Sequence, residues 1–282
     1  MVKIAAMGDN VVDCYLSRNT MFPGGNCLNV SVFVRKFGGQ SAYVGAIGKD
    51  AAGNVIVNAL TAEGVDISHL RILDGSTAYC IIGHRNADRV FVTFDLGISM
   101  FAPSEQDFAF LNSFDAVHFG QSSGLDAHLG RAAGICKLSY DFSNKYTDAR
   151  INDIAPFCFL ASVSARDNSR TQAVALTRQV LEAGAKWVLV TRGPQGAMLG
   201  HGADVFEVPA AAADLVDTLG AGDTFIACTL YGLLNGETPS DLLQTAAEAA
   251  AETCGYYGAV GRGAPIALQV DVDAIRASNP GL

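Results

Sequence analysis

Basic residues are scarce in this sequence. Lysine and arginine together number 19, against 28 aspartate and glutamate residues, and the formal net charge is −9. No stretch of the chain gathers lysine and arginine into a cluster. Because attachment to nucleic-acid phosphates depends on such clusters, we expect no nucleic-acid partner.

Long apolar runs are missing too, although half of the residues are hydrophobic. A helical membrane span needs roughly 18 apolar residues in a row, so we expect no membrane partner. The first residues, Met1 to Ile4, lead straight into a strand pattern and predict no signal peptide. The seven cysteines are odd in number, form no Cys-x-x-Cys pair and mostly lie in apolar segments. They predict reduced thiols and a cytoplasmic location.

Several catalytic signatures are absent as well. The chain has no Gly-x4-Gly-Lys-Ser/Thr phosphate loop, and its best Gly-x-Gly-x-x-Gly match has Phe225 in place of the third glycine. There is no His-Glu-x-x-His, and the five histidines are scattered. We therefore expect no structural zinc.

One signature from a different enzyme class is present. Gly120-Gln121-Ser122-Ser123-Gly124 fits Gly-x-Ser-x-Gly and follows a predicted strand, as the nucleophile of a serine hydrolase does. A triad would also need a downstream histidine, and His201 is the distant candidate. A serine hydrolase acting through Ser122 is therefore one alternative to the function argued below.

The order of predicted elements indicates an α/β fold. Strand-like and helix-like segments alternate along most of the chain, which predicts a three-layer α/β/α domain with a mainly parallel sheet. The length of 282 residues suits a single domain over 1–282. The predicted strands are 2–7, 42–47, 116–119, 138–142, 157–161, 187–191 and 197–200, and the predicted helices are 26–37, 50–63, 123–134, 169–183 and 241–256.

A different sequence pattern indicates a second, smaller unit. The segments 71–73, 77–85 and 89–95 are short, β-branched and alternating, with turns at Asp74-Gly75 and Asn86-Ala87-Asp88. They predict hairpins. With residues 11–22 they should form a small β-sheet lid, whose segments lie near 11–22 and 71–101. Exposed edge strands tend to be covered, so we expect a homodimer through this lid.

The stretch from Asp217 to Phe225 predicts the catalytic centre. Gly220 and Gly222 let an anion approach the backbone, and a helix pattern begins at Ala221. The unpaired amides and the positive dipole end of that helix favour a phosphate. Asp223 would repel a bound phosphate, which we explain by a role as general base toward an attacking hydroxyl.

Polar residues elsewhere could bind ligands. Asp9 and Asp13 follow the first strand, where open α/β sheets bind their ligands. Asn26 and Asn29 lie one turn apart on one helix face, suited to sugar hydroxyls. The turn Thr191-Arg192-Gly193-Pro194-Gln195-Gly196 could lie against a polyphosphate.

Two motifs together resemble the ribokinase-like (PfkB) family of sugar and nucleoside kinases. They are Gly24-Gly25-Asn26-Cys27-Leu28-Asn29-Val30 and Asp217-Thr218-Leu219-Gly220-Ala221-Gly222-Asp223-Thr224-Phe225, and the resemblance extends over about residues 2–266. It implies ATP-dependent phosphorylation of a sugar hydroxyl with Mg²⁺. The implied roles are general base for Asp223, anion hole for Gly220, Ala221 and Gly222, substrate binding for Asp13, Gly25, Asn26 and Asn29, nucleotide binding for Thr191, Gly193, Gly196 and Gly222, and a monovalent cation such as K⁺ for Asp217.

The acceptor is predicted from shorter similarities. Residues 8–13, 88–91 and 140–145 are similar to the family's fructoselysine kinases, which implies phosphorylation of a primary hydroxyl of a fructosamine. Arg89, Asp141 and Lys145 are the candidates for contacting the attached amino acid. A kinase for a free ketohexose or a nucleoside is the alternative acceptor class.

One departure from the family bears on magnesium. Ser162-Val163-Ser164-Ala165 stands where the family often carries Asn-x-x-Glu. Magnesium would then be held through phosphates and waters, or by Asp167. The same departure is the one feature that favours a non-catalytic sugar sensor, while the intact Asp223 argues against it.

Overall fold

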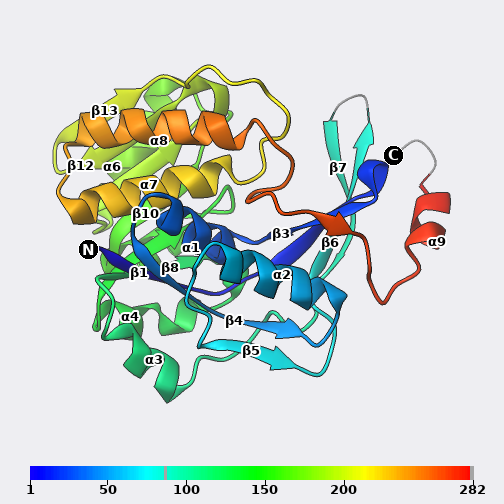
Figure 1. Ribbon diagram of the computed structural model, residues 1–282. Coiled ribbons are helices and arrows are strands. Elements are labelled where there is room, and N and C mark those ends of the chain that lie inside the picture. Colours follow the sequence, from blue (N-terminus) through cyan, green and yellow to red (C-terminus); the bar gives the residue numbers. More distant parts are fainter. Residues whose placement is uncertain (86–87, 280–282) are drawn as a thin grey trace.

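The computed structural model describes residues 1–85 and 88–279, with backbone only at residues 84, 85, 88 and 89. Its main sheet has nine strands within these residues. The predicted three-layer α/β/α class is confirmed (Figure 1). In sheet order the strands are β13 (Asp204–Val208), β12 (Ala197–His201), β11 (Trp187–Thr191), β10 (Cys158–Ser164), β9 (Lys137–Asp141), β8 (Ala116–Gly120), β1 (Lys3–Met7), β4 (Gln40–Gly48) and β5 (Leu70–Leu73).

The main sheet is mostly parallel and buried on both faces. From β11 to β5 every neighbouring pair is parallel, while β12 and β13 are antiparallel additions. Along β1, Ile4 and Ala6 face one core and Ala5 and Met7 face the other. This alternation follows from the two-residue period of a strand. Parallel strands end at the same edge, so ligand-binding side chains gather there.

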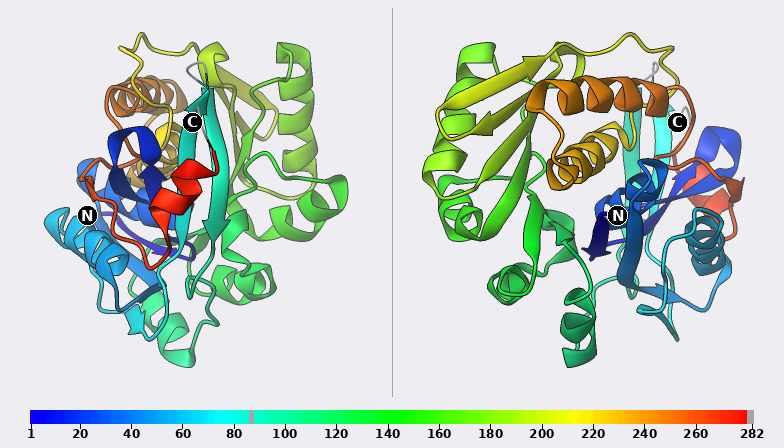
Figure 2. Two further views of the ribbon diagram at one scale, coloured as in Figure 1. Left: turned by 90° about the vertical axis from the view of Figure 1, so that its right-hand side faces the viewer. Right: turned by 60° about the vertical axis from the view of Figure 1, so that its left-hand side comes forward.

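Helices cover both faces of the sheet (Figure 2). Capping residues set several helix starts: the Asp50 carboxylate accepts the Gly53 amide at 2.8 Å, and Ser104 and Asp107 form a capping box. One face carries α1 (Asn26–Lys36), α2 (Ala51–Ala62), α7 (Ala221–Asn235) and α8 (Pro239–Thr253), and the other carries α3 (Glu105–Leu111), α4 (Leu129–Ala133), α5 (Asp148–Ile154) and α6 (Arg170–Glu182). The short α9 (Val272–Ala277) lies near the end of the chain.

A smaller five-stranded sheet stands to one side, on the right in Figure 1. Its strands in order are β14 (Ala264–Pro265), β3 (Thr20–Gly24), β2 (Val11–Tyr15), β6 (Tyr79–Arg85) and β7 (Asp88–Asp95). The segment 71–73 was expected here, and that expectation is wrong. It lies in β5, which pairs in parallel with β4 in the main sheet. The connection through α2 makes β4 and β5 a βαβ unit, and short exposed edge strands look alike in either sheet.

Other details of the structure differ from the predictions. The expected helix over 123–134 is a pair of 3₁₀ turns followed by the short α4, because Gly124 adopts a left-handed conformation with φ of 66°. The sequence pattern also missed α5 and β13, which are short. In the part of the chain that the structure describes, no helix is both long and apolar enough to cross a bilayer.

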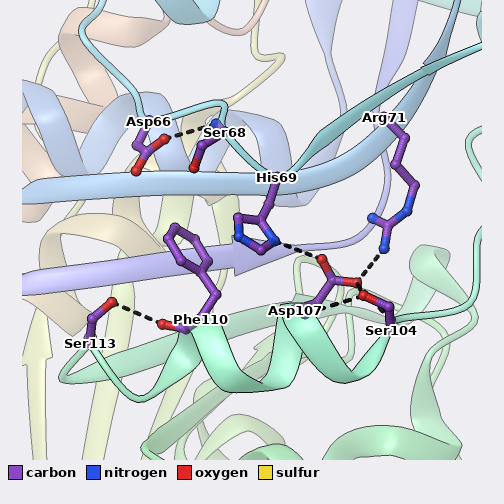
Figure 3. Close-up of polar contacts among 8 residues, drawn as sticks. All are labelled: Asp66, Ser68, His69, Arg71, Ser104, Asp107, Phe110 and Ser113. Carbon is purple, nitrogen blue, oxygen red and sulfur yellow. Dashed lines mark hydrogen bonds and ion pairs between the residues drawn. The ribbon is translucent and has the colours of Figure 1, made fainter.

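A buried carboxylate ties the edge strand β5 to α3 (Figure 3). Asp107 lies 2.9 Å from Nδ1 of His69, accepts a hydrogen bond from Arg71, and accepts the Ser104 amide at 2.6 Å. The His69 ring stacks on Phe110 at 4.0 Å. Burial raises the pKa of Asp107, but the bonds from His69, Ser104 and Arg71 outweigh it and leave the pKa lowered.

We expect Asp107→Asn to lower the free energy of unfolding at neutral pH by about 2 kcal/mol, because it removes the buried charge toward which His69, Arg71 and the Ser104 amide point. Because the pKa of Asp107 is lower in the folded than in the unfolded state, its ionised carboxylate stabilises the fold at pH values above the unfolded-state pKa, which is near 4. This contribution is lost as the pH falls through the folded-state pKa. Urea unfolding at pH 7 and below pH 4 measures this. The control is Glu105→Gln, whose solvent-exposed pair with Arg131 should contribute far less to stability. Equal losses for both variants would contradict the assignment.

Candidate active site

A polar cavity of about 360 Å³ opens at the carboxyl edge of the main sheet. The ends of β9, β10 and β11 supply Asp141, Ser164 and Thr191, and the amino end of α7 faces them. Hydroxyl groups, two carboxylates and glycine backbone therefore share one space. The lining residues are Asp141, Ser143, Ser162, Val163, Ser164, Thr191, Thr218, Leu219, Gly220, Gly222, Asp223 and Ile226.

The start of α7 depends on a glycine. Gly220 is the N-cap with φ of 83°, and a Cβ there would lie 2.7 Å from the Cα of Ala259. Only glycine adopts this conformation at little cost and leaves room for the neighbouring chain. Gly220 and Gly222 both line the cavity, so the first turn of α7 presents amides and its positive dipole end to it. This arrangement suits an anion.

Asp223 sits in that first turn and lines the cavity, partly exposed. Asn26 donates to its Oδ1 at 2.8 Å and Asn29 to its Oδ2 at 2.7 Å. Burial raises the pKa of Asp223 to about 6, against the two amide bonds that lower it, and the charge of Asp9 adds to the increase. The two motifs at opposite ends of the sequence thus meet through side-chain bonds. The amide nitrogens expected to face sugar hydroxyls are engaged with the carboxylate.

Asp141 is the second carboxylate of the cavity. It accepts the same Asn26 nitrogen at 3.1 Å and the Ser143 amide at 2.9 Å. Burial raises its pKa to about 7; the Ser143 bond lowers it, and the charges of Asp223 and Asp9 raise it further. Sequence reasoning placed Asp141 against an attached amino acid, whereas the structure places it beside Asp223. Its position at the end of a predicted strand was the signal for a site in the cavity.

Asp9 and Gly25 shape the start of α1. The Asp9 carboxylate accepts the amides of Asn26 at 3.0 Å and Cys27 at 3.4 Å, and the Ser123 hydroxyl at 2.9 Å. Gly25 is the N-cap, with φ of 107°. Asp9 therefore caps a helix from a distance and holds Asn26 in place, and its binding to substrate stays a prediction.

Asp13 and Asp217 lie toward the smaller sheet. Asp13 is buried on β2 and lies outside the lining of the cavity. Asp217 accepts the Tyr15 hydroxyl at 2.5 Å and the amides of Leu219 and Gly258 at 3.1 Å each. The loop before α7 is thereby bonded to β2. The Arg89 side chain lies outside the described residues, so its predicted contact with substrate stays a prediction.

The predicted nucleotide turn follows β11. Thr191 lines the cavity, and its hydroxyl lies 3.4 Å from that of Ser164. Gly193 and Gly196 flank a 3₁₀ turn just beyond. The turn joins β11 to the antiparallel β12, and this places it at the same sheet edge as the start of α7.

The hydrolase interpretation of Ser122 is wrong. Ser122 is exposed after the carboxyl end of β8. His201 stacks on Trp187 at the start of β11, which is the opposite edge of the sheet. A triad between these two residues is therefore excluded, because its members must be within hydrogen-bond reach.

Comparisons with known proteins identify the family. The family model described as pfkB family carbohydrate kinase matches residues 3–266. The fructosamine kinase FrlD of Bacillus subtilis is 37% identical over 95% of this chain and 96% of that protein. The fructoselysine 6-kinase of Escherichia coli is 33% identical over 92% of this chain and all of that protein.

Solved structures agree on the fold. A ribokinase of Arabidopsis thaliana, complexed with ribose and ATP, superposes with a TM-score of 0.81 at 20% identity, over 93% of this chain and 96% of that one. The chain belongs to the pfkB family of carbohydrate kinases and is an ATP-dependent phosphotransferase.

Proposed function

We propose that the enzyme transfers the γ-phosphoryl group of ATP to a primary hydroxyl of a fructosamine such as fructoselysine, with Asp223 as general base. The observation that carries the chemistry is the position of Asp223, which lines the cavity from the first turn of α7. The acceptor class rests on the two relatives that match nearly full length and carry the names fructosamine kinase and fructoselysine 6-kinase.

The phosphates would bind at the start of α7. The amides of Gly220, Ala221 and Gly222 would form the anion hole for the moving phosphoryl group, and backbone donors of this kind stabilise the transition state strongly. Thr191, Gly193 and Gly196 would hold the rest of the triphosphate. With a pKa of about 6, Asp223 is mostly ionised at neutral pH and can accept the hydroxyl proton as the oxygen attacks phosphorus.

The cavity fits magnesium through groups other than an Asn-x-x-Glu pair. Magnesium binds through one or two carboxylates, with phosphates and waters filling its other positions. Asp141 lies in the cavity, and the buried Ser162 hydroxyl there has no partner in the described part of the chain. We propose that these two residues hold the ion, in place of the exposed Asp167. A bound magnesium ion would neutralise charge on the phosphates.

The sugar would lie on the other side of Asp223, between α1 and the smaller sheet. Asp13, Gly25, Asn29 and Arg89 are its proposed contacts. The smaller sheet would act as the lid that keeps water out. The Tyr15 bond to Asp217 joins that sheet to the loop of the anion hole, which supports a closed arrangement of the two.

We expect fructoselysine to give the highest kcat/KM among possible acceptors. The measurement is coupled ADP release with fructoselysine, fructose, ribose, other furanoses and adenosine at equal concentrations. Free fructose should follow, at a value roughly tenfold or more lower, because it cannot make contacts to an attached amino acid. A higher value for adenosine or ribose would overturn the proposed acceptor and leave the kinase chemistry standing.

Further proposals concern assembly and surroundings. The smaller sheet ends in β7, where Phe91 and Phe94 are each 67% exposed. An apolar edge strand of this kind supports a homodimer through the lid, measurable by sedimentation.

The seven free thiols support a reducing, cytoplasmic location. A K⁺ ion at Asp217 would have to displace donors that already satisfy this carboxylate, so we do not extend the proposal to it.

A further inference from the structure

The side chain of Asn26 connects the two carboxylates of the cavity. Its Nδ2 lies 2.8 Å from Oδ1 of Asp223 and 3.1 Å from Oδ2 of Asp141. A primary amide has two donors, both on nitrogen, and its oxygen only accepts. Both N–H groups are therefore committed to carboxylates, and the amide oxygen needs a donor of its own.

That donor is a buried histidine. Nε2 of His118 lies 2.8 Å from Oδ1 of Asn26, and Nδ1 of the same ring lies 2.9 Å from the hydroxyl of Ser139. His118 and Ser139 are paired across β8 and β9 and are fully buried. A ring with its proton on Nε2 donates to Asn26 and accepts from Ser139. This tautomer satisfies all three groups at once.

We propose that His118 is a positioning residue, which fixes the orientation of the Asn26 amide so that both amide hydrogens point at Asp141 and Asp223. The inference rests on the proposed role of Asp223. A flipped amide would turn its oxygen toward two carboxylates and, with the ring proton on Nε2, its N–H groups toward another donor, so both contacts would be unfavourable.

Two further features support this assignment. The amide oxygen occupies a confined place, since a Cβ at Gly120 would lie 2.3 Å from it. Burial lowers the pKa of His118 to about 3, so the ring stays neutral and cannot exchange roles by gaining a second proton near neutral pH. The hydrogen-bonded chain Ser139–His118–Asn26 therefore holds a fixed orientation beside the Asp223 carboxylate. The His118 ring keeps its protonation state over the pH range in which Asp223 titrates.

The first test does not depend on turnover. ¹⁵N NMR of the imidazole groups in the unliganded enzyme should show one neutral histidine with its proton on Nε2 that does not titrate between about pH 5 and pH 8. His118→Gln assigns the signal by its loss. A signal with the proton on Nδ1, or one that titrates in this range, overturns the proposal, whatever the substrate of the enzyme.

The second test separates positioning from packing. His118→Gln can still donate an N–H to Asn26, whereas His118→Leu cannot. We expect kcat of the leucine variant to fall about tenfold or more, and that of the glutamine variant to fall less. Only the leucine variant loses the donor to the Asn26 oxygen, and with it the fixed orientation of the amide hydrogens toward the two carboxylates. The acidic limb of the kcat/KM profile should move to higher pH by up to about 1 pH unit in the leucine variant, since a lost donor raises the pKa of the Asp223 carboxyl. Equal losses with unmoved limbs would show that His118 only fills space. If the leucine variant does not fold, Ser139→Ala replaces it, because this variant keeps the ring. We expect a smaller shift of the acidic limb in the same direction, and an unmoved limb would count against the proposal.

Discussion

Asp223→Asn is expected to lower kcat by roughly 10²- to 10⁴-fold, the range that a positioned general base contributes. The variant keeps the shape of the side chain and loses the capacity to accept a proton. Its amide oxygen can still accept one of the two bonds from Asn26 and Asn29. ATP binding should change little, and removing a negative charge beside the phosphates should strengthen it if anything. Steady-state kinetics and titration calorimetry with ATP measure the two effects separately.

The wild-type pH profile provides a second measurement of the same residue. Burial raises the pKa of Asp223 to about 6, so the base is protonated and inactive below that value. We expect kcat/KM for the sugar to fall about tenfold per pH unit below about pH 6 and to level off above it. Asp223→Asn should abolish this limb. Asp107→Asn is the matched control, because it alters a buried carboxylate away from the cavity and should leave kcat near normal at neutral pH. Near-normal turnover in Asp223→Asn would refute the role.

Local sequence patterns were enough to predict the helix start at Ala221 and the mainly parallel sheet. These features depend on glycine placement and on residues close together in the chain. The bonds from Asn26 and Asn29 to Asp223 span 197 and 194 positions, and no local pattern encodes them. Two separate motifs could be assigned to one site only through the family resemblance.

The errors have the same physical origin. The segment 71–73 was placed in the smaller sheet because an alternating edge strand does not specify its partner. Asp141 was assigned to the attached amino acid because the sequence does not show which strand ends face α7. His118 was missed altogether: a single histidine in an apolar strand looks like a core residue, and its proposed role depends on a bond to Asn26, which lies 92 positions earlier in the chain.

Gly220→Ala is expected to cost both stability and catalysis. A non-glycine residue at φ of 83° is strained by about 1 to 2 kcal/mol. The new Cβ would also lie 2.7 Å from the Cα and Cβ of Ala259, so the start of α7 must move. Because the amides of this turn form the proposed anion hole, we expect kcat/KM for ATP to fall by about 10²-fold or more, similar to the loss of one such donor elsewhere.

Gly236→Ala separates the effect of backbone strain from the effect of a steric clash that displaces the helix. Gly236 ends the same helix with φ of 79°, and a Cβ there would meet nothing within 4 Å. Its alanine variant should lose about 1 kcal/mol of stability and keep normal kinetics with ATP, because the strain is present without the clash. Urea unfolding and ATP kinetics of both variants, measured side by side, decide the matter. If Gly220→Ala lost only as much as Gly236→Ala in both measurements, the first turn of α7 would have room to adjust, and its backbone would not be the part of the enzyme that holds the phosphoryl group.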